Sequence, residues 1–306
     1  MKKISLVVLI SLFFVACNKD GDIFIDDPSD NITQPLPDDE SPMSLGYSVV
    51  EYTPAPGQFI NEDVTGFGNI KTQEEACKQA EERLAENLYV SLGAWGGYIV
   101  VKFDNPVANS GDSYDFSIMS NSFDTSNEPG IVWVMTDNNK NGLPDDIWYE
   151  LKGSYFGKDG YERNYWVKYT RPEEEGNTPW EDSNGETGYV MWLGSYHSQP
   201  FYYPQWIEED SYTLYGSRLP STAIQNPVTG IWTNEPFEWG YADNFGSDFW
   251  KEGNRNYFSI SDAVTEDNEA ADLKEIDFVK VQTAVNSTAG VIGENSTEVC
   301  GFFIEE

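Results

Sequence analysis

Histidine and cysteine are scarce in this chain of 306 residues, which contains one histidine, His197, and three cysteines. The sequence therefore excludes a zinc site built from several histidines, and no cluster of cysteines replaces it. A Ser-His-Asp triad would have to use His197, but no G-x-S-x-G sequence precedes that residue. We expect His197 to be a surface or loop residue without a catalytic role.

Basic residues are also few, because 18 Lys and Arg face 52 Asp and Glu, and the formal net charge is −34. A chain with this charge repels nucleic acid and anionic lipid, so we expect neither as a partner. Such acidity suits an extracellular protein that must stay soluble, and it suits a medium that contains calcium.

The only long apolar run is residues 4–15, and it is too short to span a membrane comfortably. It follows Lys2 and Lys3, as the apolar segment of a signal peptide follows a basic one. The next residues, Phe14-Val15-Ala16-Cys17, resemble a bacterial lipobox, which implies cleavage before Cys17 and lipid attachment to its thiol. The alternative is a single uncleaved anchor helix. Removal of residues 1–16 as a signal peptide takes away two lysines and no acid, so the charge falls from −34 to −36.

The residues after Cys17 carry a second localisation signal. Lys19 is followed by several aspartates, which is similar to the surface-export signal of Bacteroidetes lipoproteins and implies the outer face of the outer membrane. Residues 17–43 are rich in Asp and Pro and show no periodicity, so we expect a disordered tether. With Cys17 lipidated, Cys77 and Cys300 remain, and the sequence leaves open whether they form a disulfide.

Residues 44–306 are expected to form one all-β domain, a jelly-roll-like β-sandwich with one short amphipathic helix and long aromatic loops. The chain is 15% aromatic and contains 26 Gly and 16 Pro, a composition that favours β structure. Thr72 and Glu75 form a capping box, and apolar residues then recur every four positions, which predicts a helix over residues 72–88. The strands predicted from apolar and aromatic runs are 97–103, 114–119, 131–135, 147–151, 163–169, 188–193, 212–215, 257–260, 276–284 and 298–304.

The stretch 131–150 places a loop rich in oxygen ligands between two of these strands. Asp137, Asn139 and Asn141 stand at alternate positions and Gly142 follows, as in the D-x-N-x-N-G loops of dockerins and thrombospondin-type repeats. Ca²⁺ takes six to eight oxygen ligands, and such a loop supplies them from side chains and one backbone carbonyl. The acid that an EF-hand carries at position 12 is absent, so this loop is not an EF-hand. We expect it to hold a structural Ca²⁺ ion. The alternative is a plain polar turn. The predicted ligands are Asp137, Asn139, Asn141, Leu143 through its carbonyl, Asp145 and Asp146.

Aromatic residues gather in the central third of the chain, residues 171–250, where Pro and Gly interrupt any strand pattern. Long aromatic loops on a rigid β scaffold commonly carry binding sites, although aromatic side chains also fill cores. The residues predicted to bind a ligand are Trp180, Trp192, Tyr196, Tyr202, Tyr203 and Trp206. Of these, Tyr202, Tyr203 and Trp206 are expected at the surface, because their segment shows little alternation.

A pair of catalytic carboxylates is the alternative for an enzyme, since a glycosidase is defined by the geometry of two acids. Four glutamates lie near aromatic residues and are the candidates for such a pair: Glu128, Glu150, Glu235 and Glu238. Most of the 52 acids are expected to be solvated surface residues, so we do not predict an enzyme.

Several stretches together resemble a family of Bacteroidetes cell-surface lipoproteins of the β-sandwich type. They are residues 56–62, 91–101, 126–134, 141–146 with 148–151, 240–244 and 276–284. The resemblance covers essentially all of residues 53–305. Ala94 departs from it, because a third glycine is typical there. The family implies a surface protein, in some cases accompanied by outer-membrane systems that take up nutrients, including corrinoids.

These observations predict a lipid-anchored, surface-exposed protein that captures a small extracellular ligand beside an outer-membrane transporter. Aromatic faces would stack on a sugar ring or a flat macrocycle, and neighbouring polar groups would donate and accept hydrogen bonds. The sequence does not decide between a glycan and a corrinoid. A glycoside hydrolase or lyase and a structural or adhesion protein are the alternatives.

Overall fold

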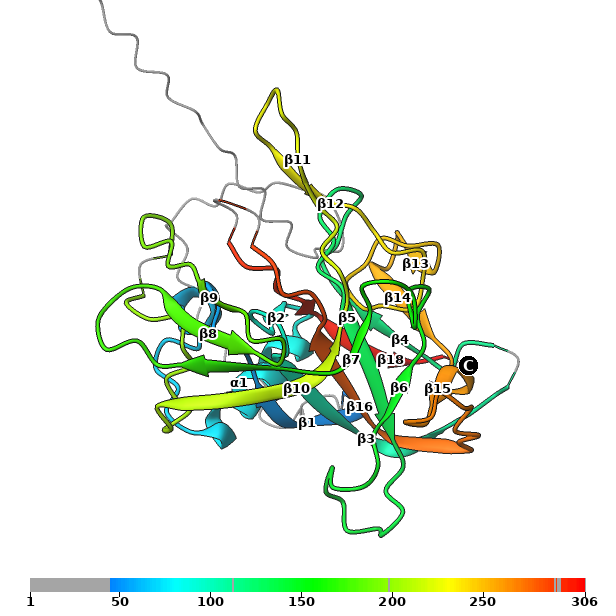
Figure 1. The fold of residues 1–306 in the computed structure, drawn as a ribbon. Helices are drawn as coiled ribbons and strands as arrows, with labels where there is room; N and C mark the ends of the chain where they lie inside the picture. The colour runs from blue at the N-terminus through cyan, green and yellow to red at the C-terminus, as the bar shows by residue number, and fades with distance from the viewer. Residues whose placement is uncertain (1–44, 112, 198, 289, 291–292, 306) are drawn as a thin grey trace, which may run out of the picture. The chain divides into compact units, whose positions relative to one another are not determined.

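The structure is a computed structural model, and it describes residues 45–305 apart from 112, 198, 289 and 291–292 (Figure 1). The expected signal peptide, the lipidated Cys17 and the tether over residues 17–43 lie outside the described residues. The described residues belong to one compact unit, Ser44–Glu306. No helix among them is long and apolar enough to cross a membrane.

The fold is all-β, as predicted, with several antiparallel sheets and one α-helix among the described residues. The largest sheet has six strands in the order β1 (Tyr47–Thr53), β3 (Tyr98–Ala108), β16 (Glu275–Thr283), β5 (Gly130–Met135), β6 (Tyr149–Leu151) and β15 (Ala263–Val264). Every neighbouring pair in it is antiparallel.

A four-stranded sheet shares a hydrophobic core with the first and gives the sandwich its second layer. Its order is β13 (Phe249–Trp250), β14 (Arg255–Phe258), β4 (Phe116–Met119) and β18 (Gly301–Ile304). The core joins Val101 and Val279 of the large sheet to Phe116 and Phe302 of the small one. Burial of these side chains, worth about 1.5–3 kcal/mol each, holds the two layers together.

Strand β3 shows why the large sheet is covered on both faces. Ile99, Val101 and Phe103 alternate toward the sandwich core. Val100 points to the opposite face, where it packs with Met135 and Phe278. Successive side chains of a strand point to opposite faces, so a continuous apolar run buries both sides.

A third sheet and two short pairs of strands complete the fold (Figure 1). The third sheet runs β10 (Ser211–Arg218), β7 (Glu162–Thr170), β8 (Thr178–Asp182) and β9 (Thr187–Val190), and its core contains Trp95, Tyr165 and Tyr169. β17 (Glu298–Val299) pairs with β2 (Val90–Ser91), and β11 (Ala223–Gln225) forms a hairpin with β12 (Trp232–Asn234). The described part of the chain also contains the 3-10 helices η1 (Asp63–Thr65) and η2 (Ile260–Asp262).

Helix α1 (Gln73–Ala85) packs on the core through Ala76, Ala80 and Leu84. Its N-terminus is capped as predicted, because Thr72 Oγ1 accepts a hydrogen bond from the Glu75 N–H at 3.2 Å. It ends three residues before the predicted position 88, and Asn87 adopts a left-handed conformation with φ 55°.

The sequence left the pairing of Cys77 and Cys300 open. Cys77 lies in α1 and Cys300 precedes β18. Both thiols are buried and do not form a disulfide with each other.

Candidate functional sites

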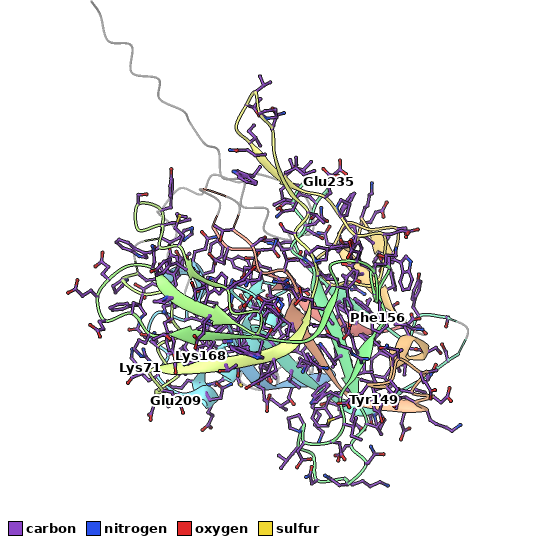
Figure 2. All side chains as sticks on the ribbon, in the orientation of Figure 1. Lys71, Tyr149, Phe156, Lys168, Glu209 and Glu235 are labelled. Carbon is purple, nitrogen blue, oxygen red and sulfur yellow. The ribbon has the colours of Figure 1, made fainter. Side chains whose placement is uncertain are left out.

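The loop between β5 and β6 extends from the ends of these two inner strands of the large sheet, and Tyr149 at the start of β6 marks its base (Figures 1 and 2). Asp137 accepts hydrogen bonds from two N–H groups of the loop, Asn141 at 3.1 Å and Gly142 at 2.8 Å. Gly142 has φ 76°, a conformation that glycine adopts without steric cost. One aspartate therefore fixes the turn that the spacing of the loop predicts.

The remaining oxygen-bearing side chains of the loop face one another. Asn139 Oδ1 accepts the Asn141 N–H at 2.9 Å, and Asn141 Oδ1 accepts the Leu143 N–H at 2.8 Å. The amide groups of Asn139 and Asn141 donate to Asp145 at 3.0 and 2.9 Å, and these bonds, that of Asn141 first, lower the pKa of Asp145. Asp146 Oδ2 accepts the Asn139 N–H at 3.4 Å.

The donor set of this loop fits Ca²⁺. It offers three carboxylates, two amide oxygens and the backbone carbonyl of the seventh position, all hard oxygen ligands. No three Asp, Glu, His or Cys side chains of the described residues already surround one point as a metal site would require. Amide and carbonyl oxygens are not among those residue types, and in this loop they stand between the acids.

An open polar groove of about 670 Å³ adjoins the loop. Its walls carry charges of both signs, with Lys102 and Lys140 near Asp137, Glu275 and Asp277. The Asp137 N–H donates to Asp277 at 2.7 Å, which ties the first residue of the loop to strand β16.

Tyr202, Tyr203 and Trp206 do not lie at the surface, and the prediction that they do is wrong. Their exposed fractions are 0%, 1% and 5%. Tyr202 and Tyr203 belong to the core under the third sheet, and Trp206 belongs to the main core, where it lies against Tyr52 and Phe67. A ring buried in this way offers no face to a ligand.

The segment is buried because a distant loop supplies its hydrogen bonds. Asn61 donates to the carbonyls of Phe201 and Tyr203, each at 2.8 Å, and accepts the Gln205 N–H at 3.1 Å. The Gly57 N–H donates to the Tyr202 carbonyl at 3.1 Å. Backbone groups satisfied in this way can be buried without strand pairing.

The other three predicted aromatic residues lie in and after the β8–β9 hairpin. Trp180 and Trp192 are half-buried, and each ring packs closely over a glycine, Gly188 and Gly194 respectively. Tyr196 is 58% exposed. The six residues therefore do not form one aromatic surface.

A pocket of about 280 Å³ lies elsewhere, between the sandwich layers and the segment that carries Trp239. It combines aromatic rings with polar side chains, which is the usual make-up of a small-molecule site. Its lining residues are Tyr114, Leu151, Lys152, Trp239, Gly240, Ser247, Asp248, Tyr257, Phe258, Ser259 and Asp262. They were not predicted from the sequence, because they come from several separate segments of the chain and share no local pattern.

Two aspartates of this pocket hold their protons more tightly than usual. Burial raises the pKa of Asp248 to about 6, although its Oδ2 accepts the Gly240 N–H at 2.7 Å. Burial also raises the pKa of Asp262, and Lys152 partly offsets that effect. The pocket therefore presents one carboxyl group, that of Asp248, which changes between donor and acceptor of hydrogen bonds near pH 6.

The four glutamates considered as catalytic candidates are divided between the interior and the surface, and none lines this pocket. Glu128 is half-buried and Glu150 is buried, and Glu150 accepts hydrogen bonds from Tyr161 at 2.8 Å and Ser217 at 2.6 Å. Glu235 and Glu238 are exposed, and Figure 2 labels Glu235 beside the β11–β12 hairpin.

His197 lies in a loop, as predicted, where its side chain is half-buried. It contacts the Glu62 carboxylate and packs edge-on against Phe59, with ring centroids 4.8 Å apart. These two contacts hold the imidazole ring in place within the loop.

No family model matches the chain, and a search of the curated proteins finds no match.

Proposed function

We propose that this protein is a lipid-anchored, surface-exposed outer-membrane protein that binds a small extracellular glycan for an uptake system. The pocket beside Trp239 is the observation that carries the binding proposal. The loop over residues 137–146 holds a structural Ca²⁺ ion, and the transporter is the expected partner. The lipid anchor is Cys17.

The contents of the pocket favour a sugar over a corrinoid. Trp239 is 36% exposed and Tyr114 is 50% exposed, so part of each side chain is accessible to a ligand. Sugar rings stack their C–H faces on aromatic rings, and their hydroxyls pair with carboxyl, hydroxyl and ammonium groups such as Asp248, Ser247 and Lys152. A volume of about 280 Å³ suits one or two sugar rings, whereas a corrinoid macrocycle is several times larger than one ring.

Binding of oligosaccharides to the Trp239→Ala variant tests this proposal, with Trp250→Ala as its matched control. Both tryptophans are partly exposed, at 36% and 43%, but Trp250 does not line the pocket. We expect Trp239→Ala to weaken binding about tenfold or more and Trp250→Ala to leave it unchanged. Equal effects of the two substitutions would place the ligand elsewhere.

Hydrolysis of a glycan is the second candidate, and one observation favours it. Asp248 and Asp262 line the same pocket, and burial raises the pKa of both. A carboxyl with a raised pKa serves as the general acid of a glycosidase, while a second carboxylate acts as base or nucleophile. Turnover of a bound glycan that Asp248→Asn abolishes, with binding retained, would establish the enzyme. Binding without turnover would leave the capture function.

Labelling of the lipid anchor tests the proposed location. Cys17→Ser should abolish incorporation of labelled fatty acid and release the protein from the membrane. Labelling that persists in the variant would contradict the anchor at Cys17.

A further inference from the structure

The third sheet has one face in a core and one face toward solvent. On β7, Tyr165, Val167 and Tyr169 are buried. Trp166 and Lys168, which alternate with them, are only half-buried. Successive side chains of a strand point to opposite faces, so Trp166 and Lys168 belong to the outer face. Figure 1 shows this sheet at the front of the molecule, and Figure 2 labels Lys168 on it.

Aromatic rings stand at two opposite corners of the outer face. Tyr215 of β10 pairs directly with Trp166 of β7, so both side chains rise from the same face. Tyr189 of β9 lies two strands further across, paired with Pro179 of β8. Tyr215 and Tyr189 are 67% and 61% exposed. Within the part of the chain that the structure describes, the side chains of these three aromatic residues make no hydrogen bond and no ring contact, so they are free for a ligand.

The centre of the outer face carries one base and one acid, which neutralise each other. One row across the four strands consists of Thr213, Lys168, Glu181 and Thr187. Lys168 Nζ lies 3.1 Å from Glu181 Oε1, and the two side chains are 40% and 52% exposed. The other outward side chains of the paired rows are Thr, Ser, Pro and aromatic residues. In a chain of formal charge −34, this face is therefore neutral.

A neutral face of rings and hydroxyl groups fits a neutral polysaccharide. The C–H face of a sugar ring stacks on an aromatic side chain, and sugar hydroxyls pair with Thr hydroxyls and with the exposed ion pair. An anionic ligand would need a free cation, but Lys168 is already paired with Glu181. A protein partner fits less well, because protein interfaces have an apolar centre and a polar rim, whereas this face has its charges at the centre.

We propose that the outer face of the third sheet, through Trp166, Tyr215 and Tyr189, is a second binding surface that holds several consecutive sugars of a neutral polysaccharide. Trp166 and Tyr189 are two strand spacings apart across the sheet, roughly 10 Å. They are also four residues apart along it, from the row of Trp166 to that of Thr170, or roughly 13 Å. A single sugar does not reach both corners.

This surface shares no residue with the pocket beside Trp239. The inference rests on the proposed capture of a glycan and adds a second contact to it. The sheet holds a stretch of the polysaccharide chain, while the pocket takes one or two sugar rings. Two contacts on one chain retain a long glycan more firmly than either contact alone.

Affinity gel electrophoresis of the purified chain tests the surface. The probes are hydroxyethylcellulose, galactomannan and arabinoxylan, with polygalacturonate as the anionic probe. We expect a neutral probe to retard the chain, and we expect Tyr215→Ala to weaken that binding about tenfold or more. Tyr215→Phe keeps the ring and should keep the binding. Trp250→Ala is the control, because Trp250 is 43% exposed on β13, outside both surfaces.

Two results of this experiment would overturn the inference. One is a wild-type chain that no neutral probe retards. The other is a Tyr215→Ala variant that the probe retards as strongly as the wild type. Loss of stability does not confuse the test, since Tyr215 is exposed and its substitution should leave the free energy of unfolding nearly unchanged.

The Trp239→Ala background separates this surface from the pocket. Tyr215→Ala should weaken polysaccharide binding by the same factor in the wild-type and the Trp239→Ala chains, because distant sites act independently. If Tyr215→Ala has no effect in either background while Trp239→Ala abolishes all glycan binding, the pocket stands and the surface falls. If Trp239→Ala changes nothing and Tyr215→Ala removes the retardation, the surface stands and the pocket falls.

Self-association is the competing use of such a face. Sedimentation of the wild-type chain and of Tyr215→Ala, without glycan, measures it. We expect both chains to sediment as the same species. A dimer of the wild-type chain that Tyr215→Ala dissociates, together with no retardation by neutral probes, would show that the face joins two copies of the chain and would overturn the inference.

Discussion

The backbone N–H of Gly142 donates a hydrogen bond of 2.8 Å to Oδ2 of Asp137. The first acid of the loop thus holds the residue at which the chain turns back. This contact joins the two features on which the calcium interpretation depends, a carboxylate at the first position and a glycine at the sixth.

Asp137→Ala should lower the stabilisation that Ca²⁺ gives. An ion present at about 100 times its Kd adds about 2.7 kcal/mol of stability, which corresponds to roughly 5–10 °C for a domain of this size. We expect chelator to lower the melting temperature of the wild-type chain by more than that of the variant. Asp159→Ala, an exposed acid in another loop, is the control and should respond as the wild type does. If chelator lowered the melting temperature of all three chains equally, the loop would be a plain turn without a bound ion.

Gly142→Ala should disturb the loop in two ways. A non-glycine residue at φ 76° is strained by about 1 kcal/mol or more, and the added Cβ would lie 2.9 Å from Lys102 Nζ. Gly157→Ala introduces the same strain at φ 69°, with no atom within 4 Å of the new Cβ. Thermal unfolding should show a loss of stability in both variants, but only Gly142→Ala should weaken Ca²⁺ binding. Unchanged Ca²⁺ affinity in Gly142→Ala would contradict the site.

Trp206→Ala should destabilise the protein without changing its ligand affinity. The ring is 5% exposed and packs against Tyr52 and Phe67, so its removal leaves a cavity and costs about 3–5 kcal/mol. Denaturant unfolding measures the loss, and binding is measured where the variant is still folded. A variant that keeps its stability but loses the ligand would show that the residue is exposed to the ligand after all.

The pH dependence of stability should include a contribution from Asp248. Its pKa is raised from 3.8 to about 6 in the folded chain, so between these values the folded state binds more protons than the unfolded state. Stability therefore falls as the pH rises from about 4 to 6, by at most about 3 kcal/mol from this group. Asp248→Asn should flatten this part of the profile of unfolding free energy against pH. A profile identical to that of the wild type would refute the raised pKa.

Local patterns predicted the fold class and the helix. The capping box and the four-residue spacing of Ala76, Ala80 and Leu84 describe contacts within one segment, and such contacts survive folding of the whole chain. The loop at Asp137 could be interpreted for the same reason, since the hydrogen bonds between residues of the loop join positions at most seven apart.

The positions of the aromatic residues could not be predicted, because they depend on distant partners. Burial of Tyr202 and Tyr203 rests on hydrogen bonds from Asn61, about 140 residues earlier. The pocket brings Tyr114 and Trp239 together from segments with no common motif. Asp243 and Glu298 look like ordinary surface acids among 52, and only the folded chain buries them side by side.

Equilibrium binding of the purified chain, in calcium buffer, to a panel of host and plant glycans and to cobalamin tests the central claim most directly. The account predicts a glycan bound at micromolar or tighter Kd, lost in Trp239→Ala and kept in Trp250→Ala. Binding of cobalamin alone, or of nothing in the panel by a chain that unfolds cooperatively, would contradict the proposed capture of a glycan.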